Sequence, residues 1–131
     1  MNRPRVLLAD DHSSVIERVS ALLQPGFEVV GAVANGKELL FESARLLPDV
    51  IVLDISMPEL SGIEAVHELR STGSTAKVVF LTVQTGVEFV RACLDEGALG
   101  YVIKSRLATD LIPAIQHALS GQSFISSPTS R

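Results

Sequence analysis

Five polar side chains follow short apolar runs in this chain of 131 residues. They are Asp10, Asp11, Asp54, Thr82 and Lys104. Continuous apolar runs are typical of strands buried in a parallel sheet, whose carboxyl ends meet at the edge where ligands bind. We therefore expect three carboxylates, a hydroxyl and an ammonium group to converge on one site.

The chemistry of this set favours a divalent cation and a phosphoryl group. Neighbouring carboxylates repel one another strongly unless a cation joins them. Oxygen ligands without His or Cys select Mg²⁺, for which Mn²⁺ can substitute, rather than Zn²⁺. Thr82 and Lys104 would then bind phosphoryl oxygens, and one carboxylate is left as a nucleophile. The set therefore predicts phosphoryl transfer to an aspartate of the protein itself.

Five apolar runs alternate along the chain with five segments that carry apolar residues at helical spacing. The runs cover residues 6–9, 27–33, 50–53, 78–81 and 99–103, and the helical segments include 15–23, 39–47, 63–69, 87–94 and 111–119. This order requires right-handed crossovers and a parallel sheet with helices on both faces. Pro113 would fall in or just past the first turn of a helix that begins near Thr109.

The composition indicates a single globular α/β domain, with 47% apolar and 20% charged residues. The net charge of −4 argues against nucleic-acid binding by this segment. One cysteine, Cys93, excludes an internal disulfide and fits a reducing compartment. No apolar run approaches the roughly 18 residues of a membrane helix, and the apolar run near the start is too short for a signal peptide. We therefore expect a cytoplasmic protein that does not bind membranes.

The motifs together closely resemble the receiver domain of bacterial two-component response regulators, from residue 4 to about residue 121. The resemblance is carried by Asp10-Asp11 after an apolar run, Asp54-Ile55-Ser56-Met57-Pro58, Gly62, Leu81-Thr82 and Gly100-Tyr101-Val102-Ile103-Lys104. It implies a flavodoxin-like (βα)5 fold, doubly wound, with strand order 2-1-3-4-5.

The resemblance also implies a role for each site residue. Asp54 would be the phosphoacceptor, and Thr82 and Lys104 would bind phosphoryl oxygens. The Mg²⁺ ion would be held by Asp11 directly, by Asp10 mainly through water, by Asp54 and by the backbone carbonyl of Ser56. Two further roles are implied: Tyr101 would be a switch whose ring moves inward when Thr82 moves, and Ser56 and Gln84 would tune the lifetime of the acyl phosphate.

Two residues depart from the common receiver pattern. Ser105 follows the lysine where many receivers have proline, and Val83 follows the threonine where many have Ala or Gly. The LuxR/FixJ-type (NarL-like) subfamily tolerates both, and the end of the chain resembles the junction of receiver and linker in that subfamily. We therefore interpret residues 1–121 as the receiver domain and residues 122–131 as the start of a linker or a disordered tail. The helix-turn-helix DNA-binding output domain of such regulators is absent from this chain.

The expected function is that of a phosphorylation switch. A sensor histidine kinase would transfer a phosphoryl group to Asp54 in a Mg²⁺-dependent reaction, and the resulting conformational change would control an output, transcription in this subfamily. Such a receiver is not a turnover enzyme, and the family often forms a homodimer on phosphorylation. The alternative is an atypical receiver that acts as a protein-interaction module without phosphorylation.

Two other classes of protein fit less well. A phosphatase of the haloacid dehalogenase type needs an acid/base Asp two residues after the nucleophile, and that position is Ser56. A flavodoxin-like nucleotide or flavin binder needs a phosphate-cradling loop after the first strand, where Asp10 and Asp11 would repel phosphate. The three histidines share no spacing that suggests a metal site. We interpret His12, His67 and His117 as surface or packing residues.

Overall fold

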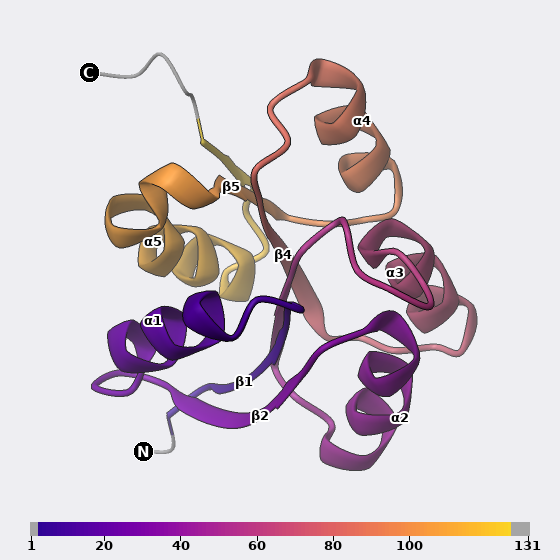
Figure 1. Cartoon of the computed structure of the whole chain (residues 1–131), viewed down its shortest axis with the longest axis horizontal. Helices are drawn as coiled ribbons and strands as arrows, with labels where there is room; N and C mark the ends of the chain where they lie inside the picture. The colour runs from indigo at the N-terminus through magenta and orange to yellow at the C-terminus, as the bar shows by residue number, and fades with distance from the viewer. Residues whose placement is uncertain (1–2, 127–131) are drawn as a thin grey trace.

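The computed structural model describes residues 3–126 and contains one parallel sheet with helices on both faces (Figure 1). The strands are β1 (Arg5–Ala9), β2 (Glu28–Val33), β3 (Val50–Leu53), β4 (Lys77–Thr82), β5 (Gly100–Ile103) and β6 (Phe124–Ile125). The helices are α1 (Ser13–Leu23), α2 (Gly36–Leu46), α3 (Gly62–Ser71), α4 (Val87–Asp95) and α5 (Leu107–Leu119), with a short 3-10 helix, η1 (Lys104–Arg106), before α5. This alternation confirms the predicted α/β fold.

The sheet has the order β2-β1-β3-β4-β5-β6, so the predicted order of the first five strands is confirmed. All neighbouring strands pair in parallel. The order in which successive strands are added reverses at β1, because β2 pairs with one side of β1 and β3 pairs with the other. A crevice forms at the carboxyl ends of the strands at such a reversal point, and ligands bind there in open α/β sheets.

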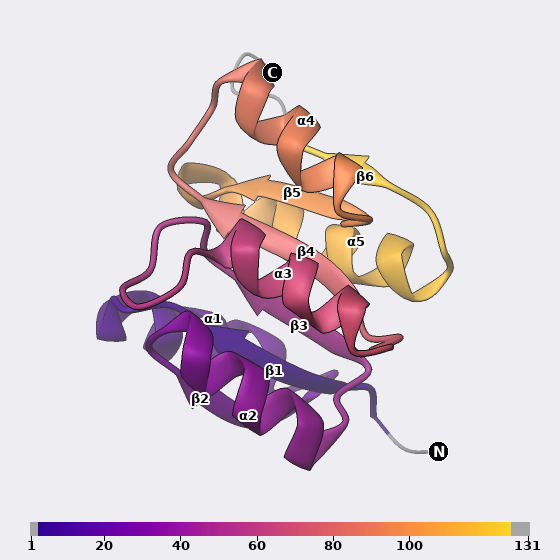
Figure 2. The same cartoon turned by 90° about the vertical axis from the view of Figure 1, so that its right-hand side faces the viewer.

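Two hydrophobic cores lie on opposite faces of the sheet, because successive side chains of a strand point to opposite sides. Val6 and Leu8 face the core beneath α1 and α5, and Leu7 and Ala9 face the core beneath α2, α3 and α4. Figures 1 and 2 show the two groups of helices on either side of the strands. The strands β1, β3, β4 and β5 are buried on both faces, whereas β2, at the edge of the sheet, is partly exposed. Within residues 3–126, none of the helices is both long and apolar enough to cross a membrane.

The helix α5 differs from the sequence-based expectation at its start. It begins at Leu107 rather than near Thr109, because the 3-10 helix η1 leads directly into it. Pro113 is therefore the seventh residue of α5, in the helix interior, and the expectation that it lies in or near the first turn was wrong. The apolar face of α5, buried against β4 and β5, stabilises the helix in spite of the amide hydrogen bond that proline cannot make.

The strand β6 lies within the segment interpreted as a linker or tail, and the sequence analysis did not predict it. It extends the sheet beyond β5, with the amide of Phe124 donating to the carbonyl of Leu99 and that of Ser126 to the carbonyl of Tyr101, both at 2.8 Å. The ring of Phe124 meets that of His117 edge-on, with 5.5 Å between centroids. Residues 127–131 of the expected tail lie outside the described residues.

A buried polar network fixes β6 to α5. The carboxylate of Asp110 accepts hydrogen bonds from the Ser126 hydroxyl (2.6 Å), from Arg106 Nε (2.9 Å) and from the Thr109 hydroxyl (3.1 Å). Burial alone would raise the pKa of Asp110, but these three donors and the charge of Arg106 outweigh it and hold the pKa below the usual value. The network therefore stabilises the ionised form of Asp110.

The Asp110→Asn variant is expected to lose about 1–3 kcal/mol of unfolding free energy at pH 7. Because the pKa of Asp110 is depressed on folding, its stabilising effect is present above the unfolded-state pKa and is lost as pH falls through the folded-state pKa. Urea unfolding across the acidic range should therefore show the gap between wild type and variant closing at low pH. The control is Asp95→Asn at an exposed position, and a gap that is independent of pH would contradict the prediction.

Candidate functional site

The crevice at the ends of β1 and β3 holds two buried carboxylates. Asp10 and Asp54 follow the paired residues Ala9 and Leu53, and the amide of Asp54 donates to the carbonyl of Ala9 at 3.0 Å. Asp10 is only 5% exposed and Asp54 only 3%. The more exposed Asp11 joins them, since one ligand atom from each of the three lies within 4.8 Å of the others. The structure thus brings the three predicted carboxylates together.

Lys104 connects these carboxylates from the far side of the crevice. Its Nζ atom lies 2.8 Å from Oδ2 of Asp10 and 2.9 Å from Oδ2 of Asp54, and its side chain is 11% exposed. Burial would lower the pKa of Lys104, but the hydrogen bonds and charges of Asp10 and Asp54 outweigh it and raise the pKa. Lys104 is therefore a fixed positive charge between the two buried carboxylates.

Thr82 is the last residue of β4, the strand that pairs with β3, and Gln84 follows two residues later. Thr82 is fully buried, and its hydroxyl accepts a hydrogen bond from the amide of Gln84 at 3.3 Å. The carbonyl of Gln84 in turn accepts a hydrogen bond from the hydroxyl of Tyr101, at 2.7 Å. The ring of Tyr101 is 1% exposed, so it packs inward under the segment between β4 and α4. Val83, between Thr82 and Gln84, is exposed.

The titration of Tyr101 reports this packing. Burial, together with the nearby charges of Cys93, Asp54 and Glu88, raises the pKa of Tyr101 to about 12. Tyr101 is the sole tyrosine of a chain without tryptophan, so tyrosinate absorbance observes it alone. A rapid pH jump should give a midpoint near 12 in the folded protein and near ~10 in urea, where the side chain is solvated.

The sign of the accompanying stability change follows from the same pKa. Because folding favours the neutral phenol, Tyr101 stabilises the fold fully below its unfolded-state pKa, and this contribution is lost as pH rises through about 12. The Tyr101→Phe variant, which lacks tyrosinate absorbance, is the blank. A folded-state midpoint near ~10 would mean that the ring is solvated and would contradict the packing.

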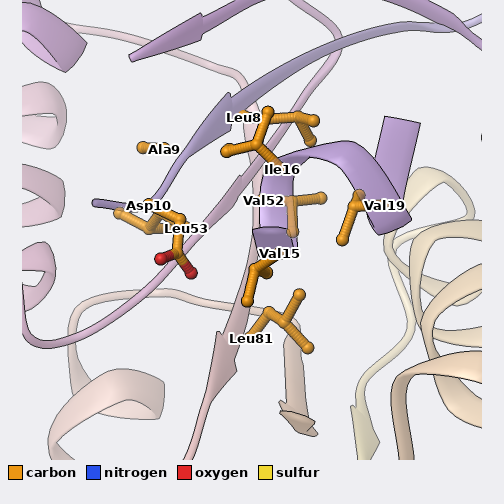
Figure 3. A pocket seen from close by; sticks show the side chains of 9 residues that line it. All are labelled: Leu8, Ala9, Asp10, Val15, Ile16, Val19, Val52, Leu53 and Leu81. Carbon is orange, nitrogen blue, oxygen red and sulfur yellow. The ribbon is translucent and has the colours of Figure 1, made fainter. Parts of the chain in front are cut away.

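The wall of the crevice beneath Asp10 is apolar. Figure 3 shows the Asp10 carboxylate beside a small pocket between α1 and the sheet, with Val15 and Leu81 among its lining residues. The pocket has a volume of about 10 Å³, room for no more than about one water molecule. A ligand of the carboxylates must therefore bind on their solvent side, and the apolar wall strengthens the electrostatic interactions of Asp10.

The segment between β3 and α3 positions Asp54 from the other side. The amide of Ser56 points toward Oδ1 of Asp54 at 3.4 Å, which leaves this oxygen weakly bonded, whereas Oδ2 is held by Lys104. The amide of Gly62, the first residue of α3, donates to the carbonyl of Ile55 at 2.7 Å. This bond closes the loop against the backbone of Asp54.

His12 lies on the surface, as expected from the sequence, with its side chain 60% exposed, but its ring also contacts two carboxylates of this site. Its Nδ1 atom lies 2.9 Å from Oδ1 of Asp10 and 3.2 Å from Oδ1 of Asp11. The backbone of His12 is extended at the start of α1, and the ring lies against the two aspartates. Its position directly after Asp11 was the available signal. His67, paired with Glu96, and His117, against Phe124, lie away from the site.

The donor set of the crevice fits a hard divalent cation. Three carboxylates and one ammonium give the crevice a net charge of −2, which a divalent ion neutralises. The carboxylate oxygens are the ligands that Mg²⁺ prefers, and one or two carboxylates leave coordination positions for water and phosphate oxygens. The acidic cluster is therefore consistent with the Mg²⁺ site typical of receiver domains.

Comparison with known proteins identifies a family over most of the chain. The family described as "Response regulator receiver domain" matches residues 6–116. The transcription regulator BvgA of Bordetella pertussis is 36% identical over 126 residues, which are 95% of this chain and 60% of BvgA. The response regulator GacA of Pseudomonas viridiflava is 36% identical over 124 residues, 93% of this chain and 58% of GacA. The chain thus spans about 60% of the length of these curated relatives.

Solved structures of response regulators also superimpose closely on this chain. A LuxR-family two-component response regulator from Aurantimonas sp. SI85-9A1 superimposes with a TM-score of 0.89 at 32% identity, over 97% of this chain and 91% of the other. The isolated receiver domain of RcsB from Salmonella enterica, solved with the phosphomimetic BeF3⁻, superimposes with a TM-score of 0.88 at 26% identity, over 96% of this chain and 95% of the other.

Proposed function

Because the chain belongs to the response regulator receiver family, we propose that it accepts a phosphoryl group on Asp54 from a sensor histidine kinase in a Mg²⁺-dependent reaction. The observation that carries this proposal is the asymmetric setting of the Asp54 carboxylate. Lys104 holds Oδ2 at 2.9 Å, while Oδ1 has only a long contact to the Ser56 amide. One oxygen is thus oriented by a cation and the other is available as a nucleophile.

The chemical step transfers phosphorus from nitrogen to oxygen. Oδ1 of Asp54 attacks the phosphorus of the kinase phosphohistidine, an O–P bond forms, the N–P bond breaks, and the imidazole leaves with the electron pair. The product is an aspartyl phosphate. A bound Mg²⁺ ion supplies positive charge for the phosphoryl oxygens. Since the chain loses this group again by hydrolysis, it is not a turnover enzyme on an external substrate.

The remaining residues take the roles that the family suggests. Asp10, Asp11, Asp54 and the carbonyl of Ser56 would hold the Mg²⁺ ion. Lys104 and the Thr82 hydroxyl would each bind a phosphoryl oxygen, which requires Lys104 to release Oδ2 of Asp54. The last roles are regulatory: Tyr101 is the switch residue, and Ser56 and Gln84 tune the lifetime of the acyl phosphate.

The output of the switch is proposed from the relatives. BvgA is a transcription regulator, and the Aurantimonas protein is of the LuxR family. We propose that the whole regulator is cytoplasmic, carries a helix-turn-helix output domain, forms a homodimer on phosphorylation and controls transcription. The acidic net charge of −4 supports the assignment of DNA binding to that other domain rather than to this one.

Intact-mass spectrometry after incubation with acetyl phosphate and Mg²⁺ tests the proposal. Wild type should gain the mass of one phosphoryl group, and both Asp54→Ala and an EDTA control should gain none. An adduct that persists in Asp54→Ala would overturn the assignment of the acceptor. If wild type shows no adduct, beryllofluoride binding decides: binding indicates a short-lived phosphoaspartate, and no binding indicates a receiver that acts without phosphorylation.

A further inference from the structure

Among the described residues, the imidazole of His12 is the one histidine side chain that lies among the carboxylates of the crevice. One ligand atom each from Asp10, Asp11, His12 and Asp54 lies within 4.8 Å of the others. The approach is through Nδ1, at 2.9 Å from Asp10 and 3.2 Å from Asp11. Lys104 occupies the other oxygen of Asp10, so His12 and Lys104 hold this carboxylate from two sides.

Neither the helix nor the core accounts for the position of this ring. His12 occupies the N-cap position of α1, yet its side chain makes no capping hydrogen bond, and the side chain is 60% exposed. A ring fixed by packing would be buried, and a capping side chain would accept a bond from the first turn. The contacts of the His12 ring are therefore those with the two aspartates.

We propose that His12 is a metal ligand that gives the crevice a preference for Mn²⁺ over Mg²⁺. The inference rests on the proposed function, because it assumes that the three carboxylates bind a divalent cation. Mn²⁺ shares with Mg²⁺ a suitability for oxygen ligands and is the weakest binder of the first-row transition-metal series, but as a transition-metal ion it accepts an imidazole nitrogen more readily than Mg²⁺, which takes oxygen ligands and retains its waters. A single nitrogen donor thus distinguishes two ions that a set of carboxylates binds in a similar way.

Metal binding by His12 requires that one ring nitrogen binds the ion while the other carries the proton. In the metal-free crevice Nδ1 lies 2.9 Å from a carboxylate oxygen, so Nδ1 carries a proton and donates it to Asp10. A bond from Nδ1 to Mn²⁺ would replace this hydrogen bond and requires the tautomer with its proton on Nε2, in which the lone pair of Nδ1 is available to the ion. With Mg²⁺ in the crevice, His12 keeps its hydrogen bond to Asp10.

Pulsed electron paramagnetic resonance of the Mn²⁺-loaded 131-residue chain observes such a bond directly. The spectrum should contain the hyperfine coupling of a ¹⁴N nucleus, which changes on labelling with ¹⁵N-histidine and disappears in His12→Ala. The matched control is His67→Ala, because His67 also pairs through Nδ1 with a carboxylate, at 3.0 Å, and is 63% exposed. This control should retain the coupling.

The affinities of the chain for Mn²⁺ and for Mg²⁺ provide the second measurement. Free Mn²⁺ is followed by its continuous-wave signal, and Mg²⁺ binding is measured by competition. His12→Ala should weaken Mn²⁺ binding by about tenfold or more and change Mg²⁺ binding by less than about twofold. An equal change for both ions, or bound Mn²⁺ without ¹⁴N coupling in wild type, would overturn the inference about His12 alone. If Asp11→Asn binds Mn²⁺ as wild type does, the metal site of the proposed function fails as well.

Discussion

Replacing Lys104 with methionine is expected to lower the free energy of unfolding by about 3–5 kcal/mol in metal-free buffer. The ammonium of Lys104 lies 2.8 Å from Asp10 and 2.9 Å from Asp54, both almost fully buried. Removal of the ammonium leaves these carboxylates close together in an apolar surrounding with no cation to offset their repulsion. The loss is therefore that of the one cation shared by two buried carboxylates and not that of a surface ion pair.

Urea unfolding in EDTA and in Mg²⁺ measures this effect and its cause. A cation that binds only the folded state stabilises it by mass action, so Mg²⁺ should recover part of the loss in Lys104→Met. Adding Asp54→Asn to Lys104→Met should also recover stability, because it removes one of the unpaired charges. The control Lys37→Met breaks an exposed pair with Glu59, at 3.8 Å, and should change stability by no more than ~1 kcal/mol. Equal losses in the two lysine variants would contradict the prediction.

The pH dependence of the Lys104 contribution has a definite sign. Because the pKa of Lys104 is raised on folding, its stabilising effect is complete below the unfolded-state pKa and is lost only as pH rises through the folded-state value. The difference between wild type and Lys104→Met should therefore be constant across neutral pH and begin to decrease only above ~10.

The Gly62→Ala variant is expected to lose about 3 kcal/mol of unfolding free energy and to slow labelling of Asp54 by acetyl phosphate about 100-fold. A Cβ atom at position 62 would lie 2.0 Å from the carbonyl oxygen of Asp54 and 2.9 Å from its carbonyl carbon. Both are backbone atoms, so the clash can be relieved only by moving α3 or the chain of the phosphoacceptor itself. Gly62 is therefore required for the close approach of α3 to Asp54.

Gly26→Ala is the matched control for this variant. A Cβ atom at Gly26 would meet no heavy atom within 4 Å, and its backbone has an ordinary negative φ. Its stability should change by no more than ~0.5 kcal/mol, with an unchanged rate of labelling. Denaturant unfolding and time-resolved mass spectrometry compare the two. If Gly62→Ala behaved like Gly26→Ala, α3 would have room that the structure does not show.

Patterns with a simple physical cause were predictable from the sequence. Strands buried on both faces leave continuous apolar runs, and a parallel sheet forces their polar continuations to one edge. For this reason the sequence predicts that Asp10, Asp54, Thr82 and Lys104 meet at one site. The structure adds the distances, in particular the position of Lys104 between two carboxylates.

The features that escaped prediction depend on tertiary contacts rather than on periodicity. The two-residue strand β6 is held by backbone pairing and by the bond of Ser126 to Asp110, neither of which leaves an apolar pattern. The position of the His12 ring depends on its contacts with Asp10 and Asp11, which leave no apolar pattern either. Pro113 is tolerated within α5 because packing on the sheet outweighs its low helix propensity.

Tyr101 connects the candidate site to β6 and Ser126, because its hydroxyl and its carbonyl each make a hydrogen bond. Its hydroxyl reaches Gln84, whose amide contacts Thr82, and its carbonyl accepts the amide of Ser126. Three hydrogen bonds thus run in series from the buried threonine to the outermost strand. A rotation of the Tyr101 ring breaks the first part of this series and leaves the second intact, whereas a shift of its backbone must carry Ser126 along or release β6. The pairing of β6 therefore distinguishes two motions. It is unchanged when only the Tyr101 ring rotates, and β6 moves or detaches when β5 is displaced.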